Sequence, residues 1–120
     1  MQTAFIVDDD ADTAEMLRIT LETEGFKAAH YLDFAHALAE VHRGPCIALI
    51  DFHVRKSSLT FEQFVSELRK HVPNIKIVAL TGDARTKAQC TNLQVDDFLL
   101  KPFDTNAIID IVGQHCPRTA

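Results

Sequence analysis

The sequence predicts a doubly wound α/β sandwich, in which helices cover both faces of one parallel β-sheet. Short apolar runs recur five times along the 120 residues, and each has the length expected of a buried parallel strand. Between the runs lie stretches whose apolar residues follow helical spacing. This alternation of strand and helix predicts (βα)5 order with right-handed crossovers.

Four of the five predicted strands end on residues that can handle a phosphoryl group or a metal ion. The first leads into Asp8–Asp10, the third into Asp51, the fourth into Thr81 and the fifth into Lys101. Ligand sites of open α/β sheets lie at the carboxyl ends of the strands, so we expect these residues to meet in one acidic pocket. The predicted strands occupy residues 4–7, 27–31, 47–50, 75–80 and 98–100.

Capping and turn residues delimit the five predicted helices. Asp33 and Asp104 suit N-cap positions, and Thr60 begins a capping box with Gln63. Gly25 suits the left-handed position after the first helix. The fourth helix has the thinnest apolar face. The helices are expected between residues 11 and 25, 33 and 44, 60 and 73, 84 and 92, and 104 and 117.

Length and composition indicate one soluble domain, residues 1–120, in which 47% hydrophobic residues suffice for a core. The net charge of -5 argues against nonspecific binding of DNA or RNA. Three aspartates directly after the first apolar run argue against a signal peptide. No run approaches the length of a membrane span. We therefore expect a cytoplasmic protein that binds neither membranes nor nucleic acid directly.

Three cysteines, Cys46, Cys90 and Cys116, show no paired spacing. We expect them to be free thiols in a reducing cytosol, because buried neutral thiols are common there.

Adjacent carboxylates at a strand end suit a hard divalent cation. Mg²⁺, or Mn²⁺ in its place, prefers oxygen ligands and is usually held by one or two carboxylates. Asp8 and Asp9 can supply them, with Asp51 as a third oxygen source from the neighbouring strand. Asp10 is interpreted as the cap of the first helix.

Lys101 and Thr81 are each ambiguous alone, because Lys101 could be a surface lysine and Thr81-Gly82 an ordinary turn. Together with the aspartates they suggest phosphoryl chemistry. A carboxylate can accept a phosphoryl group, and an ammonium and a hydroxyl can contact its oxygens. Asp51 is the best nucleophile candidate, since it stands alone on a central strand.

Four blocks of the chain resemble the receiver domain of bacterial response regulators (CheY-like), from about Thr3 to Gln114. The resemblance implies the flavodoxin-like, five-stranded sheet of order 2-1-3-4-5. The blocks are Phe5–Asp10, Leu49–Asp51, Val78–Gly82 and Asp97–Phe103.

The resemblance implies a role for each site residue. Asp51 would be the phosphoacceptor, and Asp8, Asp9, Asp51 and the backbone carbonyl of His53 would hold Mg²⁺. The remaining roles would be phosphoryl contact for Thr81 and Lys101, an aromatic switch for Phe98, and tuning of dephosphorylation for His53 and Asp83.

The implied function is a phosphorylation-dependent signalling switch rather than an enzyme. The phosphoryl donor would be a phosphohistidine on a histidine kinase or a histidine phosphotransfer protein. The surface over residues 84–114 would change and act on a downstream protein or a tethered output domain, and a homodimer could form through the same surface.

The chain departs from the family pattern in two places. Residues 55–60 lack the usual proline and glycine and contain one extra residue. Gln94-Val95 replaces the usual Gly-Ala before the fifth strand, where we expect local repacking.

Two other functions remain open. In an aspartate-nucleophile phosphohydrolase, Asp8–Asp10 would be the Asp-x-Asp motif, although Asp12 departs from that motif and 120 residues leave no room for a cap domain. A receiver-like adaptor that works without phosphorylation is the other, and the altered loop at residues 55–60 keeps it open.

Overall fold

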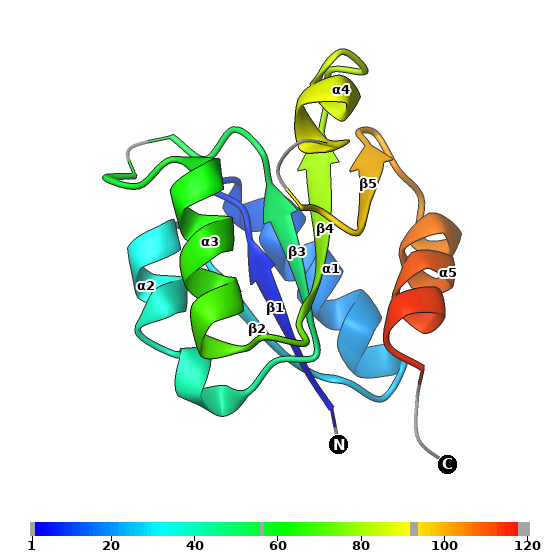
Figure 1. Cartoon of the computed structure of the whole chain (residues 1–120). Helices are drawn as coiled ribbons and strands as arrows, with labels where there is room; N and C mark the ends of the chain where they lie inside the picture. The colour runs from blue at the N-terminus through cyan, green and yellow to red at the C-terminus, as the bar shows by residue number, and fades with distance from the viewer. Residues whose placement is uncertain (1, 56, 92–93, 118–120) are drawn as a thin grey trace.

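The computed structural model describes residues 2–55, 57–91 and 94–117 and contains one five-stranded parallel sheet of order β2-β1-β3-β4-β5 (Figure 1). This order and the doubly wound α/β class confirm the predicted fold. The bounds of each strand lie within one residue of those predicted. The strands are β1 (Thr3–Val7), β2 (Lys27–Tyr31), β3 (Ile47–Asp51), β4 (Lys76–Thr81) and β5 (Asp97–Leu100).

Alternate residues of each strand face opposite layers of helices, because strand side chains have a period of two. In β1, Ala4 and Ile6 pack with α1 (Ala11–Thr23) and α5 (Thr105–His115). Phe5 and Val7 pack on the other face with α2 (Phe34–Leu38) and α3 (Phe61–His71). The three central strands, β1, β3 and β4, are thus buried between two layers, which accounts for their nearly continuous apolar sequences.

The predicted caps begin four of the helices. Asp10 accepts the N–H groups of Asp12 and Thr13, and Thr60 and Gln63 form a complete capping box. Asp33 and Asp104 cap α2 and α5. The first helix ends before Gly25, whose φ of 91° lies in the left-handed region.

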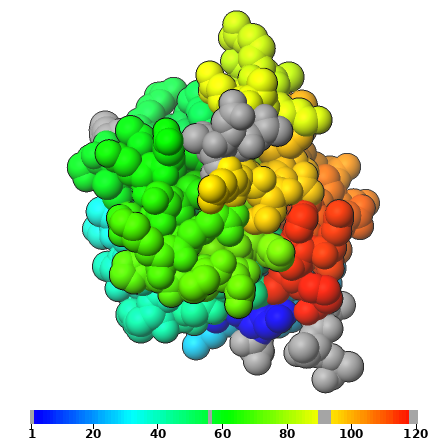
Figure 2. All heavy atoms as spheres, in the orientation of Figure 1, coloured from blue at the N-terminus to red at the C-terminus, as the bar shows by residue number. Residues whose placement is uncertain are grey.

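Two helices are shorter than predicted. The helix after Asp33 ends at Leu38 and is followed by a separate 3-10 turn, η1 (Val41–Arg43), before Gly44 reverses the chain. The fourth helix, α4 (Thr86–Thr91), begins late because the Asp83 carboxylate accepts the Arg85 N–H and holds the preceding residues in a turn. The predicted end at Asn92 lies outside the described residues. In the space-filling view, the α4 region projects beyond the rest of the molecule (Figure 2).

Cys46 and Cys116 form a disulfide, with Cα atoms 6.3 Å apart. The prediction of free thiols is therefore wrong for this pair. The two residues are 70 positions apart in sequence, and only the packing of α5 against the sheet brings them together. The side chain of Cys90 lies outside the described residues.

None of the described helices is both long enough and apolar enough to cross a membrane.

Arg69, near the end of α3, fastens the segment that leads into β5. Its guanidinium donates to the carbonyl oxygens of Ile75 and Gln94 and pairs with Asp96 at 3.0 Å. The Asp96 carboxylate also accepts the N–H of Ile77 in β4. Gln94 is held with φ of 58°, a left-handed conformation that disfavours residues with a Cβ atom.

Replacing Gln94 by glycine should stabilise the protein. A left-handed residue other than glycine costs about 1–2 kcal/mol, and glycine's larger unfolded-state entropy returns part of this gain. We expect Gln94→Gly to raise the free energy of unfolding by up to about 1 kcal/mol in urea titrations. Gln94→Ala is the matched control: it keeps the Cβ atom and should give no gain. A destabilised glycine variant would contradict this account.

Candidate functional site

The carboxyl ends of four strands meet at one edge of the sheet, around an open cavity of about 460 Å³. The predicted convergence therefore occurs for the acidic residues and the lysine. The cavity is lined by Asp8, Asp9, Asp10, Asp51, His53, Arg55, Gly82 and Lys101.

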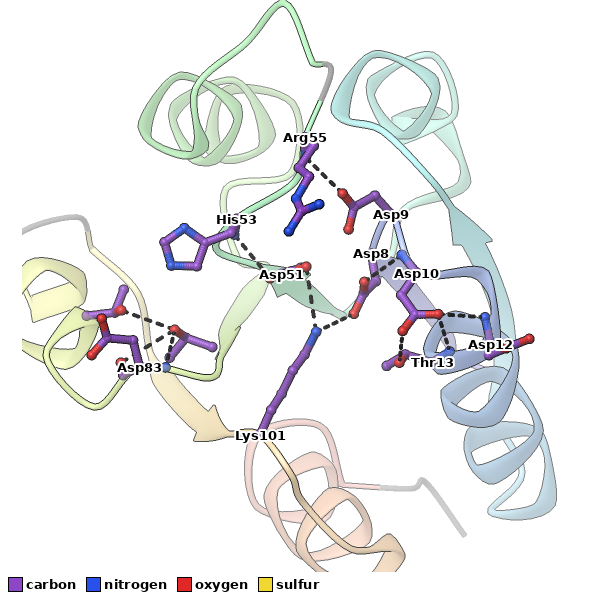
Figure 3. A network of polar contacts seen from close by, with 12 residues as sticks. Asp8, Asp9, Asp10, Asp12, Thr13, Asp51, His53, Arg55, Asp83 and Lys101 are labelled. Atoms are coloured by element: carbon purple, nitrogen blue, oxygen red, sulfur yellow. Dashed lines mark hydrogen bonds and ion pairs between the residues drawn. The ribbon is translucent and has the colours of Figure 1, made fainter.

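The Lys101 ammonium lies between two buried carboxylates (Figure 3). Its Nζ is 2.9 Å from Asp8 Oδ2 and 3.6 Å from Asp51 Oδ2. Asp8 is fully buried and Asp51 is 7% exposed. Asp8 also accepts the N–H of Asp10 through its other oxygen, at 2.9 Å. The ammonium thus joins the ends of β1 and β3 from the residue that follows β5.

Burial raises the pKa of the Asp51 carboxyl, and the charges of Asp8 and Asp9 add to this effect. The N–H of His53, 3.1 Å from Asp51 Oδ1, and the Lys101 charge oppose it without cancelling it. Burial alone would lower the pKa of Lys101, but its hydrogen bond to Asp8 and the charge of Asp51 outweigh burial, so the net shift is upward. Lys101 is therefore firmly protonated, whereas the ionised form of Asp51 is disfavoured.

Carboxylate oxygens of Asp8, Asp9 and Asp51 all lie within 4.8 Å of one another. With Lys101, these three carboxylates leave two uncompensated negative charges when all are ionised. A compact set of oxygen ligands with this charge fits a hard divalent cation such as Mg²⁺. The residues predicted from sequence to hold a metal are thus adjacent in space, and the backbone carbonyl of His53 remains a prediction.

Asp10 lines the cavity but is engaged with the first helix. It accepts the N–H groups of Asp12 and Thr13, and it accepts the Thr13 hydroxyl at 3.0 Å. The hydrogen bonds from Thr13 lower the pKa of Asp10. This geometry supports its interpretation as a helix cap.

The Thr81 hydroxyl, at the end of β4, is turned toward α4. It donates to the Thr86 hydroxyl at 3.1 Å and accepts the N–H of Asp83 at the same distance. Both threonines are buried, at 0% and 4% exposure. Thr81 is therefore bonded to the first residue of α4 and not to Asp51 in this structure.

Phe98, the predicted aromatic switch, is half-buried on β5 beside β4. The ammonium of Lys87 lies 4.7 Å from the centre of its ring, within the range of a cation–π contact. Two successive residues of α4 thus contact the predicted switch residues: Thr86 contacts Thr81, and Lys87 contacts Phe98.

His53 and Asp83 flank the cavity on the same side (Figure 3). The His53 ring packs edge-on against Phe52, with 5.0 Å between ring centres. The Asp83 carboxylate is bound by the Arg85 guanidinium at 2.8 Å, and this hydrogen bonding lowers its pKa. The predicted role of both residues in dephosphorylation stays a prediction.

Arg55 is a cavity residue that was not among the site residues predicted from the sequence. Its backbone N–H donates to Asp9 Oδ2 at 3.0 Å, and its guanidinium points into the space between His53 and Asp9 (Figure 3). In the sequence, the departure from the family pattern at residues 55–60 was the feature that could have pointed to Arg55. A second cation thus faces the cavity opposite Lys101.

A family model described as the response regulator receiver domain matches residues 4–113. The chain belongs to this family. Among curated relatives, it is 31% identical over 113 residues to the phosphate regulon transcriptional regulatory protein PhoB of Pseudomonas aeruginosa, covering 90% of this chain and 48% of the relative. It is 33% identical over 120 residues to the DNA-binding response regulator MtrA of Mycobacterium tuberculosis, covering 98% of this chain and 51% of that protein. The chain therefore spans about half the length of these relatives.

Solved receiver domains share the fold. The receiver domain of NtrX from Brucella abortus superimposes with a TM-score of 0.87 at 23% identity, over 97% of this chain and 99% of that one. The chemotaxis protein CheY4 of Vibrio cholerae gives a TM-score of 0.85 at 21% identity, over 96% of this chain and 98% of its own.

Replacing Asp51 by asparagine should stabilise the metal-free receiver domain at neutral pH. Because the folded-state pKa of Asp51 is raised, the folded protein retains a proton that the unfolded chain has already lost, so ionisation of Asp51 opposes folding as the pH rises above 3.8. We expect Asp51→Asn to raise the free energy of unfolding by on the order of 1 kcal/mol in the presence of a chelator.

The gain should shrink as the pH falls below the ordinary carboxyl value of 3.8, which urea titrations at several pH values would show. Asp104→Asn, which exchanges one good helix cap for another, is the control and should change little. If Asp51→Asn were equally or less stable than the wild type at neutral pH, ionised Asp51 would not destabilise the folded protein as argued.

Proposed function

We propose that residues 1–120 form a single receiver domain that accepts a phosphoryl group on Asp51 and acts as a signalling switch. One observation carries this proposal. Asp51 lies at the base of the cavity with the Lys101 ammonium 3.6 Å away, and oxygens of Asp8 and Asp9 lie within 4.8 Å. A nucleophile, a fixed cation and a candidate metal site are thus adjacent.

The donor in this proposal is a phosphohistidine of a histidine kinase or a histidine phosphotransfer protein. A carboxylate oxygen of Asp51 attacks phosphorus, the bond from phosphorus to the imidazole nitrogen breaks, and an aspartyl-phosphate forms. Asp8 and Asp9, with Asp51 and the His53 carbonyl, would hold Mg²⁺ or Mn²⁺, which when bound neutralises phosphoryl charge. Lys101 is already oriented at Asp51 and needs only to shift toward a phosphoryl oxygen.

The proposed switch exchanges one partner of the Thr81 hydroxyl for another. A phosphoryl group on Asp51 offers a charged acceptor in place of the neutral Thr86 hydroxyl, and hydrogen bonds to charged groups are stronger. As Thr81 turns inward, α4 loses a contact at its first residue, and Phe98 can enter the vacated space. The surface over residues 84–114 then changes for a downstream protein or a tethered output domain.

Further parts of this proposal rest on the sequence and the family, not on the geometry of the site. They include a cytoplasmic location and no direct contact with nucleic acid. The domain would catalyse only its own phosphorylation and dephosphorylation, and His53 and Asp83 would tune the dephosphorylation rate. A homodimer could form through the surface over residues 84–114.

Asp51→Asn should abolish phosphorylation. Incubation with acetyl phosphate and Mg²⁺ should add one phosphoryl group to the wild-type protein, detected by intact mass and lost on treatment with hydroxylamine. The variant should gain none, because the amide cannot act as the nucleophile.

Asp10→Asn is the matched control, because it makes the same chemical change in the same cavity while preserving a helix cap. It should still be phosphorylated. Phosphoryl transfer to Asp51→Asn would overturn the assignment, and a label mapped to Asp8 with steady turnover of phosphate esters would favour the phosphohydrolase alternative.

Thr86→Val should favour the activated state. The change keeps the shape of the side chain but removes the nearer of two acceptors of the Thr81 hydroxyl, the other being the Asp83 carbonyl at 3.5 Å, so the hydroxyl becomes more available to a phosphoryl group. We expect fluoroberyllate, a phosphoryl analogue, to bind roughly two- to tenfold more tightly in a fluorine NMR titration with Mg²⁺. Thr23→Val removes an exposed hydroxyl bonded to the Ile19 carbonyl within α1 and should leave affinity unchanged. Unchanged or weaker binding by Thr86→Val would contradict the restraining role given to the Thr81–Thr86 hydrogen bond.

A further inference from the structure

Cys46 is fixed at the centre of the sheet, at the end opposite the acidic cavity. Its N–H donates to the Thr3 carbonyl at 2.8 Å, and its carbonyl accepts the N–H of Lys76 at 3.0 Å. The residue is thus bonded to the chain on both sides, immediately before β3. It lies five residues before Asp51, which corresponds to roughly 17 Å along a strand.

Cys116 ends α5. Its N–H closes the last turn on the Val112 carbonyl at 2.8 Å, and its side chain is 3% exposed. His115 contributes a second attachment, with Nε2 2.9 Å from a carboxylate oxygen of Asp97 in β5. The last turn of α5 and the N-terminal residues lie side by side at the base of the molecule (Figure 2).

The Cys116 sulfur also has a polar neighbour that the disulfide does not use. Its Sγ lies 3.4 Å from the amide oxygen of Gln2. A disulfide sulfur has no proton to donate, whereas a thiol is a weak donor. This contact can therefore become a hydrogen bond only when the disulfide is reduced.

We propose that Cys46 and Cys116 are a reversible thiol–disulfide site, and that oxidation fastens the last turn of α5 to β3. The oxidant class is a low-molecular-weight disulfide such as glutathione disulfide. The thiolate of the more exposed Cys46 attacks one sulfur of that disulfide and releases one thiol. The Cys116 thiolate then attacks Cys46 in the mixed disulfide, forming the internal bond and releasing the second thiol. Two protein thiols are oxidised and one disulfide is reduced to two thiols.

Reduction is the reverse sequence and begins at Cys46, because Cys116 is shielded. It leaves α5 attached by its apolar face and by the contact between His115 Nε2 and a carboxylate oxygen of Asp97. The site lies at the opposite end of β3 from the acidic cavity. It acts on a helix that contributes to the surface over residues 84–114.

The first test equilibrates the whole chain with mixtures of reduced and oxidised glutathione, followed by acid quenching, alkylation and peptide mass mapping. We expect Cys46 and Cys116 to become protected together as the oxidised fraction rises and to be released together when it falls. Cys90→Ser should show the same transition. Cysteines that stay fully alkylated in oxidised glutathione, or a bond that persists in excess thiol, would overturn the proposal.

The second test measures hydrogen exchange of the wild-type protein in both redox states, which avoids variants that fail to fold. We expect residues 112–117 to exchange at least about threefold faster after reduction, because one attachment of the last turn is lost. Residues 61–71 of α3, on the opposite face of the sheet, should not change. Equal exchange of residues 112–117 in both states would rule out the proposed fastening of α5.

Gln2→Leu tests the contact between the Gln2 amide oxygen and the reduced Cys116 thiol. Removing the acceptor of the reduced thiol should make the disulfide roughly two- to fivefold harder to reduce, seen as a shift in the glutathione ratio at the midpoint. An unchanged midpoint would contradict the role given to Gln2.

Discussion

The Lys101 ammonium is the charge on which the arrangement of the site depends. Burying two carboxylates side by side is costly unless a cation compensates them, and Lys101 contacts both Asp8 and Asp51. The compensation is incomplete, because the pKa of Asp51 remains raised. Rigid parallel strands supply the precision, since each contributes its last residue or the residues just after it. The cavity therefore keeps an excess of negative charge, which a divalent cation bound together with a phosphoryl group would offset.

The strands, helices and caps could be predicted because they rest on local patterns, whereas the sheet order and the roles of the site residues came from the resemblance to receiver domains. Buried strands read as continuous apolar runs, and caps such as Asp10 and Thr60 form hydrogen bonds within three residues. The disulfide could not be predicted, because the pairing of Cys46 with Cys116 depends on how α5 packs on the sheet. The orientation of Thr81 was equally hidden, since the competing acceptor, Thr86, is unremarkable in sequence.

Departures from the family pattern had different structural meanings. Gln94 occupies a left-handed position, and Arg69 binds its carbonyl, so the main chain keeps a conformation that its side chain disfavours. The loop after Asp51 instead brings Arg55 to the rim of the cavity. One departure is thus tolerated by a compensating contact, whereas the other changes the chemical lining of the site.

The hydrogen bond from the Arg55 N–H to Asp9 Oδ2 joins the loop to a carboxylate 46 residues away. A ligand that takes this oxygen must compete with the loop for it. Ligand binding at Asp9 and the conformation of residues 53–55 are therefore coupled. By thermodynamic reciprocity, a protein that remodels this loop on docking would change affinity at Asp9 by the same factor by which a ligand at Asp9 changes docking.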